Sequence, residues 1–239
     1  MGGLVALLVV AALILIMWGT SRINKDCDVQ VASVPIPTDA IAIERGRHFV
    51  ETIGLCSECR GDRLQGDIMS DDPIFGTLAP PNLTSGVGGI GSVMTDTDYV
   101  RAIRHGIGRD GESLLIMPSN IFNAVSDADL GAVIAYFKTI PPVDNQTPET
   151  SLGPLGKAIV LLESEILTAS VIDHTAPRPP DQTPGVTAEY GKYLAAICTI
   201  CHGDNFSVRS GPRGSKRRAV GPESYAKRCA CKLVGIRFH

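Results

Sequence analysis

An internal repeat constrains this chain more than any other feature of its sequence. Glu44-Arg-Gly-Arg-His-Phe49 leads to Cys56-Ser-Glu-Cys59-Arg-Gly-Asp62, and Glu189-Tyr-Gly-Lys-Tyr-Leu194 leads to Cys198-Thr-Ile-Cys201-His-Gly-Asp204. Both copies read Glu-x-Gly-basic-aromatic, then a short helical stretch, then Cys-x-x-Cys-x-Gly-Asp. Two copies of one module predict a two-domain chain, and 239 residues are enough for two small domains.

The second copy ends in Cys198-x-x-Cys201-His202, the signature of c-type haem attachment. Two thiols at this spacing can add to the two vinyl groups of one haem, and the adjacent imidazole then offers an iron ligand. A zinc site and a thioredoxin-like redox pair are the alternatives. Zinc requires two more ligands, for which Cys229-x-Cys231 has poor spacing, and the motif lacks a βαβ context. We therefore predict haem c at Cys198/Cys201, with His202 as a ligand.

The first copy differs from the second at the position that follows its second cysteine. Arg60 stands where the second copy has histidine. A guanidinium group stays protonated and has no free lone pair, so it cannot ligate iron. His48 and His105 are candidate substitutes, although each also reads as an ordinary histidine on a helix surface. The sequence therefore argues against a second firmly held haem at Cys56/Cys59.

Met117 is the second candidate metal ligand. It lies in Leu114-Leu-Ile-Met117-Pro118, 57 residues after Arg60 and shortly before a predicted helix. A thioether is a soft iron ligand, and His/Met ligation raises a haem reduction potential. A methionine that only fills space in a core is the alternative, and spacing alone does not decide between the two.

The N-terminal segment is uncharged and apolar from Gly2 to Trp18. Seventeen helical residues span about 25 Å, at the short end of what a membrane requires. We see no cleavage site before Arg22 and no basic residue before the run, which argues against a signal peptide. We therefore predict a transmembrane anchor over residues 1–22, in preference to a signal peptide or a buried soluble helix.

The boundaries of the remaining segments are predicted from helix-breaking residues such as proline and from the helical spacing of apolar residues. We predict a linker over 23–38, a first domain over 39–145, a connector over 146–185 and a second domain over 186–239. Within them, helices are expected at about 41–50, 96–105 and 126–140, with one more in the connector at about 155–169. Thr95 or Asp96 is the expected cap of the second of these helices, and Ser126 of the third.

The charge distribution sets the C-terminal tail apart. Residues 208–239 carry nine Lys or Arg and one acid, whereas the other residues have a net charge of −11. One interpretation is a basic extension that docks an acidic partner. The other, which we favour, is an out-of-frame or chimeric end, because the composition changes where the repeat stops.

Residues 39–145 resemble a class I cytochrome c domain, most closely those of membrane-anchored dihaem cytochromes and of the cytochrome subunits of alcohol and aldehyde dehydrogenases. The resemblance implies an all-α fold around covalent haem c, with Met117 as distal ligand; the family has histidine at position 60. The second module resembles the same family only as far as Phe206, and no methionine follows His202. An incomplete second cytochrome c domain is therefore expected. The resemblance is carried by Gly46–Phe49, Cys56, Cys59, Ala79–Thr84, Gly89–Gly91, Thr95–Gly111, Met117–Ser119, Asp127–Leu130 and Pro141–Pro142, and then by Gly191–Leu194 and Cys198–Gly203.

These observations predict an electron carrier in a respiratory or dehydrogenase chain that performs no bond chemistry itself. A haem-binding subunit of a larger oxidoreductase and a degenerate cytochrome without a redox role are the alternatives. Expected partners are the membrane and a redox protein, either a dehydrogenase, a quinol-linked complex or an oxidase; no motif predicts nucleic-acid binding. Because haem c is attached outside the cytoplasm, as the resemblance implies, we expect the soluble part in the periplasm or an equivalent space at the cell membrane.

Overall fold

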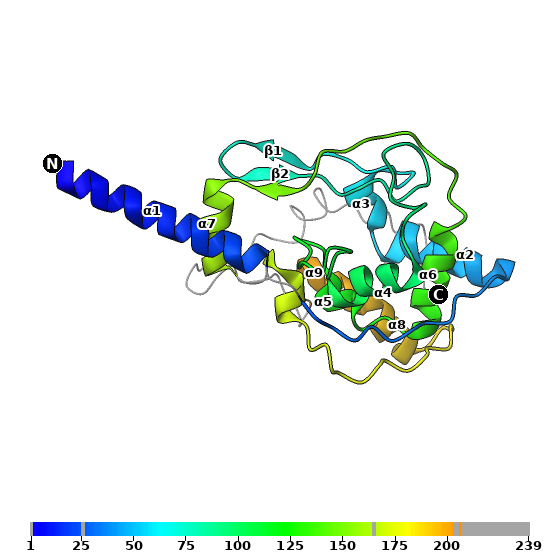
Figure 1. The fold of residues 1–239 in the computed structure, drawn as a ribbon. Coiled ribbons are helices and arrows are strands. Elements are labelled where there is room, and N and C mark those ends of the chain that lie inside the picture. The colour runs from blue at the N-terminus through cyan, green and yellow to red at the C-terminus, as the bar shows by residue number, and fades with distance from the viewer. Residues whose placement is uncertain (1, 25–26, 164–165, 203–205, 207–239) are drawn as a thin grey trace, which may run out of the picture. The chain divides into compact units, whose positions relative to one another are not determined.

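The computed structural model describes residues 2–24, 27–163, 166–202 and 206 (Figure 1). The chain divides into two compact units, Met1–Ile197 and Cys198–His239, and each is described by itself. The described part is largely helical, as expected, with one small sheet. The predictions made for the basic tail, 208–239, lie outside the described residues.

The first helix, α1 (Gly2–Ile23), is long and apolar enough to cross a membrane. Its side chains are mostly exposed, and Gly19 is the one buried residue that it contains. There α1 packs against α7 (Pro154–Leu162). A side chain at position 19 would bring its Cβ within 2.1 Å of the Lys157 carbonyl oxygen, so glycine permits the close approach of the two helices.

The repeated motif of the first unit begins on α2 (Ala40–His48), which is capped by the Asp39 side chain accepting from the Ala42 N–H. α2 packs along α6 (Asp127–Phe137), where a Cβ on Gly46 would lie 1.9 Å from the Ala132 carbonyl oxygen. The chain then continues through a π-helical turn, η1 (Phe49–Ile53), into α3 (Cys56–Arg60). The helix expected at 41–50 is confirmed.

The helices expected at 96–105 and 126–140 are also confirmed. α4 (Asp96–His105) starts with a reciprocal capping box between Thr95 and Asp98. α6 starts at Ser126, whose hydroxyl accepts from the Asp129 N–H, and it ends at Phe137. Between them lies the short α5 (Ser119–Phe122). Leu130 and Ile134 of α6 and Val100 of α4 are fully buried and form the centre of the core.

A three-stranded antiparallel sheet departs from the expected all-α fold. Its strands are β1 (Ser70–Asp72), β2 (Gly76–Leu78) and β3 (Ser151–Leu152), in the order β1-β2-β3. Ser70 pairs with Leu78, and Gly76 pairs with Leu152. Asp72 holds the turn between β1 and β2 by accepting from the N–H groups of Ile74 and Phe75. Local turn chemistry therefore makes this hairpin, not an alternating apolar pattern.

The prediction of a helix over about 155–169 in the connector is wrong beyond Leu162, where α7 ends. Leu167 pairs with Leu115 in an antiparallel bridge, and a 3₁₀ turn, η3 (Thr168–Val171), follows. The Thr168 N–H donates to the Leu114 carbonyl at 3.3 Å. Because backbone groups here bond to a distant segment, they are not free to continue the helix.

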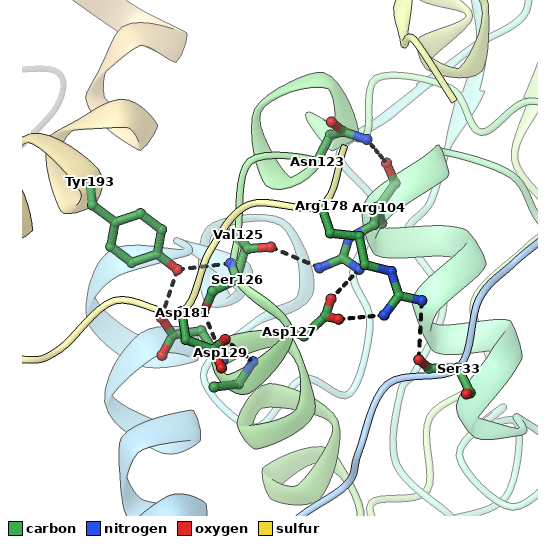
Figure 2. A network of polar contacts seen from close by, with 11 residues as sticks. Ser33, Arg104, Asn123, Val125, Ser126, Asp127, Asp129, Arg178, Asp181 and Tyr193 are labelled. Atoms are coloured by element: carbon green, nitrogen blue, oxygen red, sulfur yellow. Dashed lines mark hydrogen bonds and ion pairs between the residues drawn. The ribbon is translucent and has the colours of Figure 1, made fainter. Parts of the chain in front are cut away.

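The repeated motif of the second copy begins on α8 (Ala188–Ala195), followed by the 3₁₀ turn η4 (Ala196–Cys198) and, in the second unit, α9 (Thr199–His202). Tyr193 of α8 joins a polar network at the start of α6 (Figure 2). Its hydroxyl donates to Asp129 at 2.6 Å and accepts from the Ser126 N–H. Burial and this bond to a carboxylate raise the pKa of Tyr193, so the hydroxyl keeps its proton.

The same network holds the connector and the linker against α6 (Figure 2). The Asp127 carboxylate accepts from Arg104 at 2.6 Å and also from Arg178. Arg178 donates to the Ser33 carbonyl, and Asp181 accepts from the Ala128 N–H. Arg178 and Asp181 are thus bonded to α6, and Ser33 is held through Arg178.

Candidate functional site

A cavity of about 280 Å³ lies inside the first unit. Its volume is near the lower end of the range for ligand pockets, about 300 Å³. Apolar side chains of η1, α4, α5 and α6 and of the loops between elements form most of its wall, and a few polar groups interrupt it. The lining residues are Phe49, Cys56, Arg60, Pro81, Leu83, Ile90, Met94, Tyr99, Ala102, Ile103, Gly108, Arg109, Asp110, Leu114, Met117, Phe122, Val125, Leu130, Val133 and Phe137.

The first cysteine of the first motif contributes its thiol to this cavity. Cys56 follows Leu55, whose φ of 51° is in the left-handed region that leucine rarely adopts. Such backbone persists only where the surroundings hold it, and it is common at functional sites. Burial raises the pKa of the Cys56 thiol to about 11, so the thiol is protonated near neutral pH. Cys59 is half-buried on the next turn and does not line the cavity.

Arg60 also lines the cavity, and part of its side chain lacks a partner. Its Nε is buried and makes no hydrogen bond within the described residues. An unpartnered buried polar atom is costly and requires an explanation. Arg60 occupies the position at which the second copy has His202, but it offers no lone pair to a metal.

Met117 lines the same cavity as Cys56, so the structure brings these two predicted site residues together. The residue before it, Ile116, has a φ of 62° and is half-exposed. A β-branched residue in this conformation is an outlier. Both Cys56 and Met117 are therefore preceded by a residue with unfavourable backbone geometry, on two loops that face one cavity.

The connector supports the Met117 loop, which sequence reasoning missed. The Ile116 N–H donates to the Ile166 carbonyl, and the Thr168 hydroxyl donates to the Leu114 carbonyl at 2.9 Å. The Ala169 N–H donates to the Ser113 hydroxyl. No local pattern in 166–169 marks this pairing, because its partners lie about fifty residues away in the sequence.

The two histidines considered as substitute ligands do not line the cavity. His48 is exposed on α2 and contacts Thr52. His105 is buried, so it is not the surface histidine of the alternative interpretation, and its Nδ1 lies 3.1 Å from the Nδ1 of His174. Burial and the neighbouring His174 lower the pKa of His105 to about 4. The cavity therefore offers Cys56 and Met117 but no imidazole from the described residues.

The second motif has a different environment. Cys198 and His202 are exposed, and α9 carries Cys201 and His202. The described residues of the second unit extend only to 202, with Phe206 beyond. Attachment of haem at this motif, and ligation by His202, stay predictions.

A haem c group fits the first cavity only in part. The apolar wall, Cys56 and Met117 suit a porphyrin and its iron, whereas Cys59, the second thiol of the motif, does not line the cavity. Arg60 does not fit, because it places a cation where a neutral nitrogen ligand is needed. Among the described residues, the donor set around the cavity is therefore one ligand short of a His/Met pair.

Comparison with known proteins identifies several relatives. The chain is 35% identical over 119 residues to one subunit of the nicotinate dehydrogenase of Pseudomonas putida, covering 47% of this chain. It is 34% identical over 171 residues to the gluconate 2-dehydrogenase cytochrome c subunit of Pantoea cypripedii, covering 67% of this chain. It is 29% identical over 187 residues to the cytochrome c subunit of quinone alcohol dehydrogenase from Gluconacetobacter polyoxogenes, covering 69% of this chain.

This chain is related to cytochrome c subunits of dehydrogenases. The relatives are longer proteins, and the matched regions span 10% of the nicotinate dehydrogenase protein and 37% and 36% of the two cytochrome subunits. No protein-family model matches the sequence. The relationship agrees with the predicted type of cofactor, whereas the number of haems is not determined by it.

Proposed function

We propose that this chain carries electrons through covalently bound haem c, as a membrane-anchored subunit of a dehydrogenase complex. The observation that supports this most directly is the Cys198-x-x-Cys201-His202 motif, in a chain related to cytochrome c subunits. Bound haem supplies the one-electron redox chemistry, and the protein binds it, orients it and sets its surroundings.

The principal attachment site in this proposal is the second motif. Cys198 and Cys201 hold the haem through two thioether bonds, and His202 provides the proximal nitrogen. Exposure of Cys198 and His202 leaves them accessible to the attachment machinery. The position near the surface also permits close approach of a redox partner.

The first motif plays the weaker role. Cys56 and Cys59 are the attachment residues there, and Met117 is the ligand that the cavity supplies. Arg60 cannot complete the pair, and its unpartnered Nε is buried at the same place. The proposal therefore assigns at most one firmly held haem to the chain, at Cys198/Cys201.

The anchor and the partner complete the proposal. α1 holds the chain at the cell membrane, with residues 23–239 on the periplasmic or equivalent side. The redox partner is a catalytic dehydrogenase subunit, because the relatives are named as parts of dehydrogenases. This choice favours an electron-transfer subunit over a freely diffusing carrier.

The test is a haem count on the full chain, produced with a periplasmic haem-attachment system. A pyridine haemochrome spectrum and intact mass are measured for the wild type, for Cys198→Ala/Cys201→Ala and, as the matched control, for Cys56→Ala/Cys59→Ala. We expect about one covalent haem per chain, lost in the first variant and retained in the second. Absence of covalent haem from the wild type would refute the proposal, and retained haem without a reversible redox wave would favour a degenerate cytochrome.

A further inference from the structure

The contact between α1 and α7 fixes which part of the soluble unit is nearest to the anchor. Along α1, Ile16, Gly19, Thr20 and Ile23 are less exposed than their neighbours, and their spacing puts them on one face of the helix. α7 packs against this helix. The Gly19 backbone lies so near to Lys157 that even a methyl group would collide with its carbonyl oxygen.

This contact lies at the depth where α1 must leave a membrane. A spanning helix needs about 20 apolar residues to cross a hydrocarbon layer of about 30 Å, and α1 has 22 residues in all. Gly19 is therefore within about two turns of the end of the span. A helix packed against Gly19 lies beside the lipid headgroups, or just beneath them.

α7 itself is apolar on the side that it does not turn to the protein. Its sequence, Pro-Leu-Gly-Lys-Ala-Ile-Val-Leu-Leu, contains one charged residue, Lys157. Leu155 is 42% exposed and Leu162 is 83% exposed. These two leucines are seven residues apart and so share one face of the helix. Surface helices of soluble domains normally have polar residues there.

The tip of the β1–β2 hairpin extends the same surface. Ile74 and Phe75 are 56% and 51% exposed, and the Asp72 carboxylate holds their turn. The hairpin is joined to the start of α7, because the Leu155 N–H donates to the Ile74 carbonyl and the Gly153 N–H donates to the Phe75 carbonyl, both at 3.0 Å. We call Ile74, Phe75, Leu155 and Leu162 the apolar patch.

We propose that the apolar patch inserts into the boundary between lipid headgroups and acyl chains, beside the membrane-spanning α1. This inference rests on the proposed role of α1 as an anchor. Apolar side chains with an aromatic residue, next to a transmembrane helix, are typical of membrane-interface contacts. Lys157 and the exposed Asp71 and Glu163 flank the patch at positions where the headgroup region accepts charge.

The consequence is a fixed orientation of the soluble unit. A single spanning helix followed by a linker leaves a domain free to tumble, whereas a second contact with the lipid holds one face toward the membrane. The Met117 loop is tied to Ile166 and Thr168, which follow α7 closely in the chain. The patch therefore sets how the cavity region faces a membrane-bound electron donor or acceptor.

The test uses tryptophan fluorescence in lipid vesicles, since the chain has a single tryptophan, Trp18. The full chain is reconstituted alone in phosphatidylcholine vesicles whose acyl chains carry bromine near the headgroup or near the tail end. In a Trp18→Phe background, single tryptophans are placed by Phe75→Trp and by Leu162→Trp. The matched control is Ile41→Trp, because Ile41 is 84% exposed on α2 and is not part of the patch.

We expect the tryptophans at 75 and 162 to lose fluorescence, more with bromine near the headgroup than near the tail end, and the one at 41 to be unaffected. If the tryptophans at 75 and 162 are not quenched, like the one at 41, while Trp18 of the wild type is quenched, α1 spans the membrane but insertion of the apolar patch is refuted. If Trp18 is not quenched either, the spanning role of α1 fails and the patch falls with it. Circular dichroism of each variant checks that the fold is retained.

Discussion

The two Cys-x-x-Cys motifs of this chain differ in what surrounds them. The first lines an apolar cavity with Met117 on its wall, but Arg60 stands where the second copy has histidine. The second has its histidine, and both Cys198 and His202 are exposed. Enclosure and ligand chemistry, which a haem site normally combines, are thus found in separate copies of one module.

This difference bears on how each motif reacts as well as on what it binds. The thiolate is the reactive form of cysteine, and burial disfavours it. Burial raises the pKa of Cys56 to about 11, whereas Cys198 is exposed. The thiol of the first motif is therefore less reactive near neutral pH than an unperturbed cysteine.

Restoring the missing ligand should have the largest effect. Arg60→His puts an imidazole beside the cavity that Met117 lines, and neutral imidazole is a good iron ligand. We expect the covalent haem content to rise from about one to about two per chain. The measurement is the pyridine haemochrome spectrum together with intact mass.

The matched control for this gain is Arg60→Gln, which removes the buried cation without adding a ligand. A rise in haem with histidine alone would mean that the ligand was lacking. An equal rise with glutamine would mean that the unpartnered guanidinium was the obstacle, and the assignment of the proximal position to residue 60 would be lost. Unchanged haem in both variants would contradict the idea that the cavity is a haem site.

The next largest effect concerns the polar network that joins the connector and the linker to α6. Asp127 pairs with Arg104, whose side chain is 5% exposed, and with Arg178. Asp127→Asn leaves the Arg104 cation buried without its counter-charge, which should cost about 2–3 kcal/mol of unfolding free energy. Urea unfolding followed by circular dichroism measures this, and the haem count at Cys198/Cys201 should be unchanged.

A surface pair provides the comparison for Asp127. Glu44→Gln breaks a contact with Arg47, in which both side chains are more than 40% exposed. Exposed ion pairs contribute little to stability, so the loss should be much smaller than for Asp127→Asn. Equal losses of unfolding free energy for Asp127→Asn and Glu44→Gln would mean that the network in Figure 2 does not stabilise the fold more than a surface ion pair does.

The sequence predicts the first module well where the signal is local. The capping residue Thr95 gives α4 to the residue, and the spacing of Leu130, Val133 and Ile134 gives α6, which ends at Phe137, three residues before the predicted end. The sequence also predicts Cys56 and Met117 as site residues, and both line one cavity. The pairing of 166–169 with 113–116 could not be predicted, because each hydrogen bond joins groups far apart in sequence and carries no side-chain pattern. The hairpin over 70–78 could not be predicted either, because its first strand, Ser70–Asp72, lacks β-branched residues.

Acid should loosen the support of the Met117 loop. The His174 Nε2 lies next to the Ala169 carbonyl, so in the neutral ring Nε2 carries the proton and donates it to that carbonyl. The His174 Nδ1 is then free to accept a hydrogen bond from the His105 Nδ1–H. The pKa of His105 is lowered to about 4 in the fold, against about 6.5 in the unfolded chain. As pH falls from 7 to 5, the unfolded chain binds a proton that the folded chain does not, so stability falls by roughly 1–2 kcal/mol. Urea unfolding at the two pH values measures this.

Two histidine variants isolate that effect. His105→Gln keeps a hydrogen-bonding side chain but cannot titrate, so the loss between pH 7 and pH 5 should shrink. His48→Gln, at an exposed position, should leave the loss as in the wild type. A pH dependence that is identical in all three proteins would remove His105 as its source.

The smallest predicted effect compares one helix cap from each module. Thr95 and Asp98 bond reciprocally at the start of α4, whereas Thr187 makes a single bond, accepting from the Tyr190 N–H, at the start of α8. Thr95→Ala frees the Asp98 N–H and removes the bond from the Thr95 hydroxyl to the Asp98 carboxylate, close to the buried Tyr99 and Val100, and should cost about 1–1.5 kcal/mol. Thr187→Ala frees one N–H on an exposed turn and should cost about 0.5 kcal/mol. None of the residues Ala188–Ala195 is fully buried, so fraying of the first turn of α8 leaves the core residues of α4 and α6 covered. Equal losses in urea unfolding would mean that α8 is as much a part of that core as α4, and that the contrast between the modules begins only after Ile197.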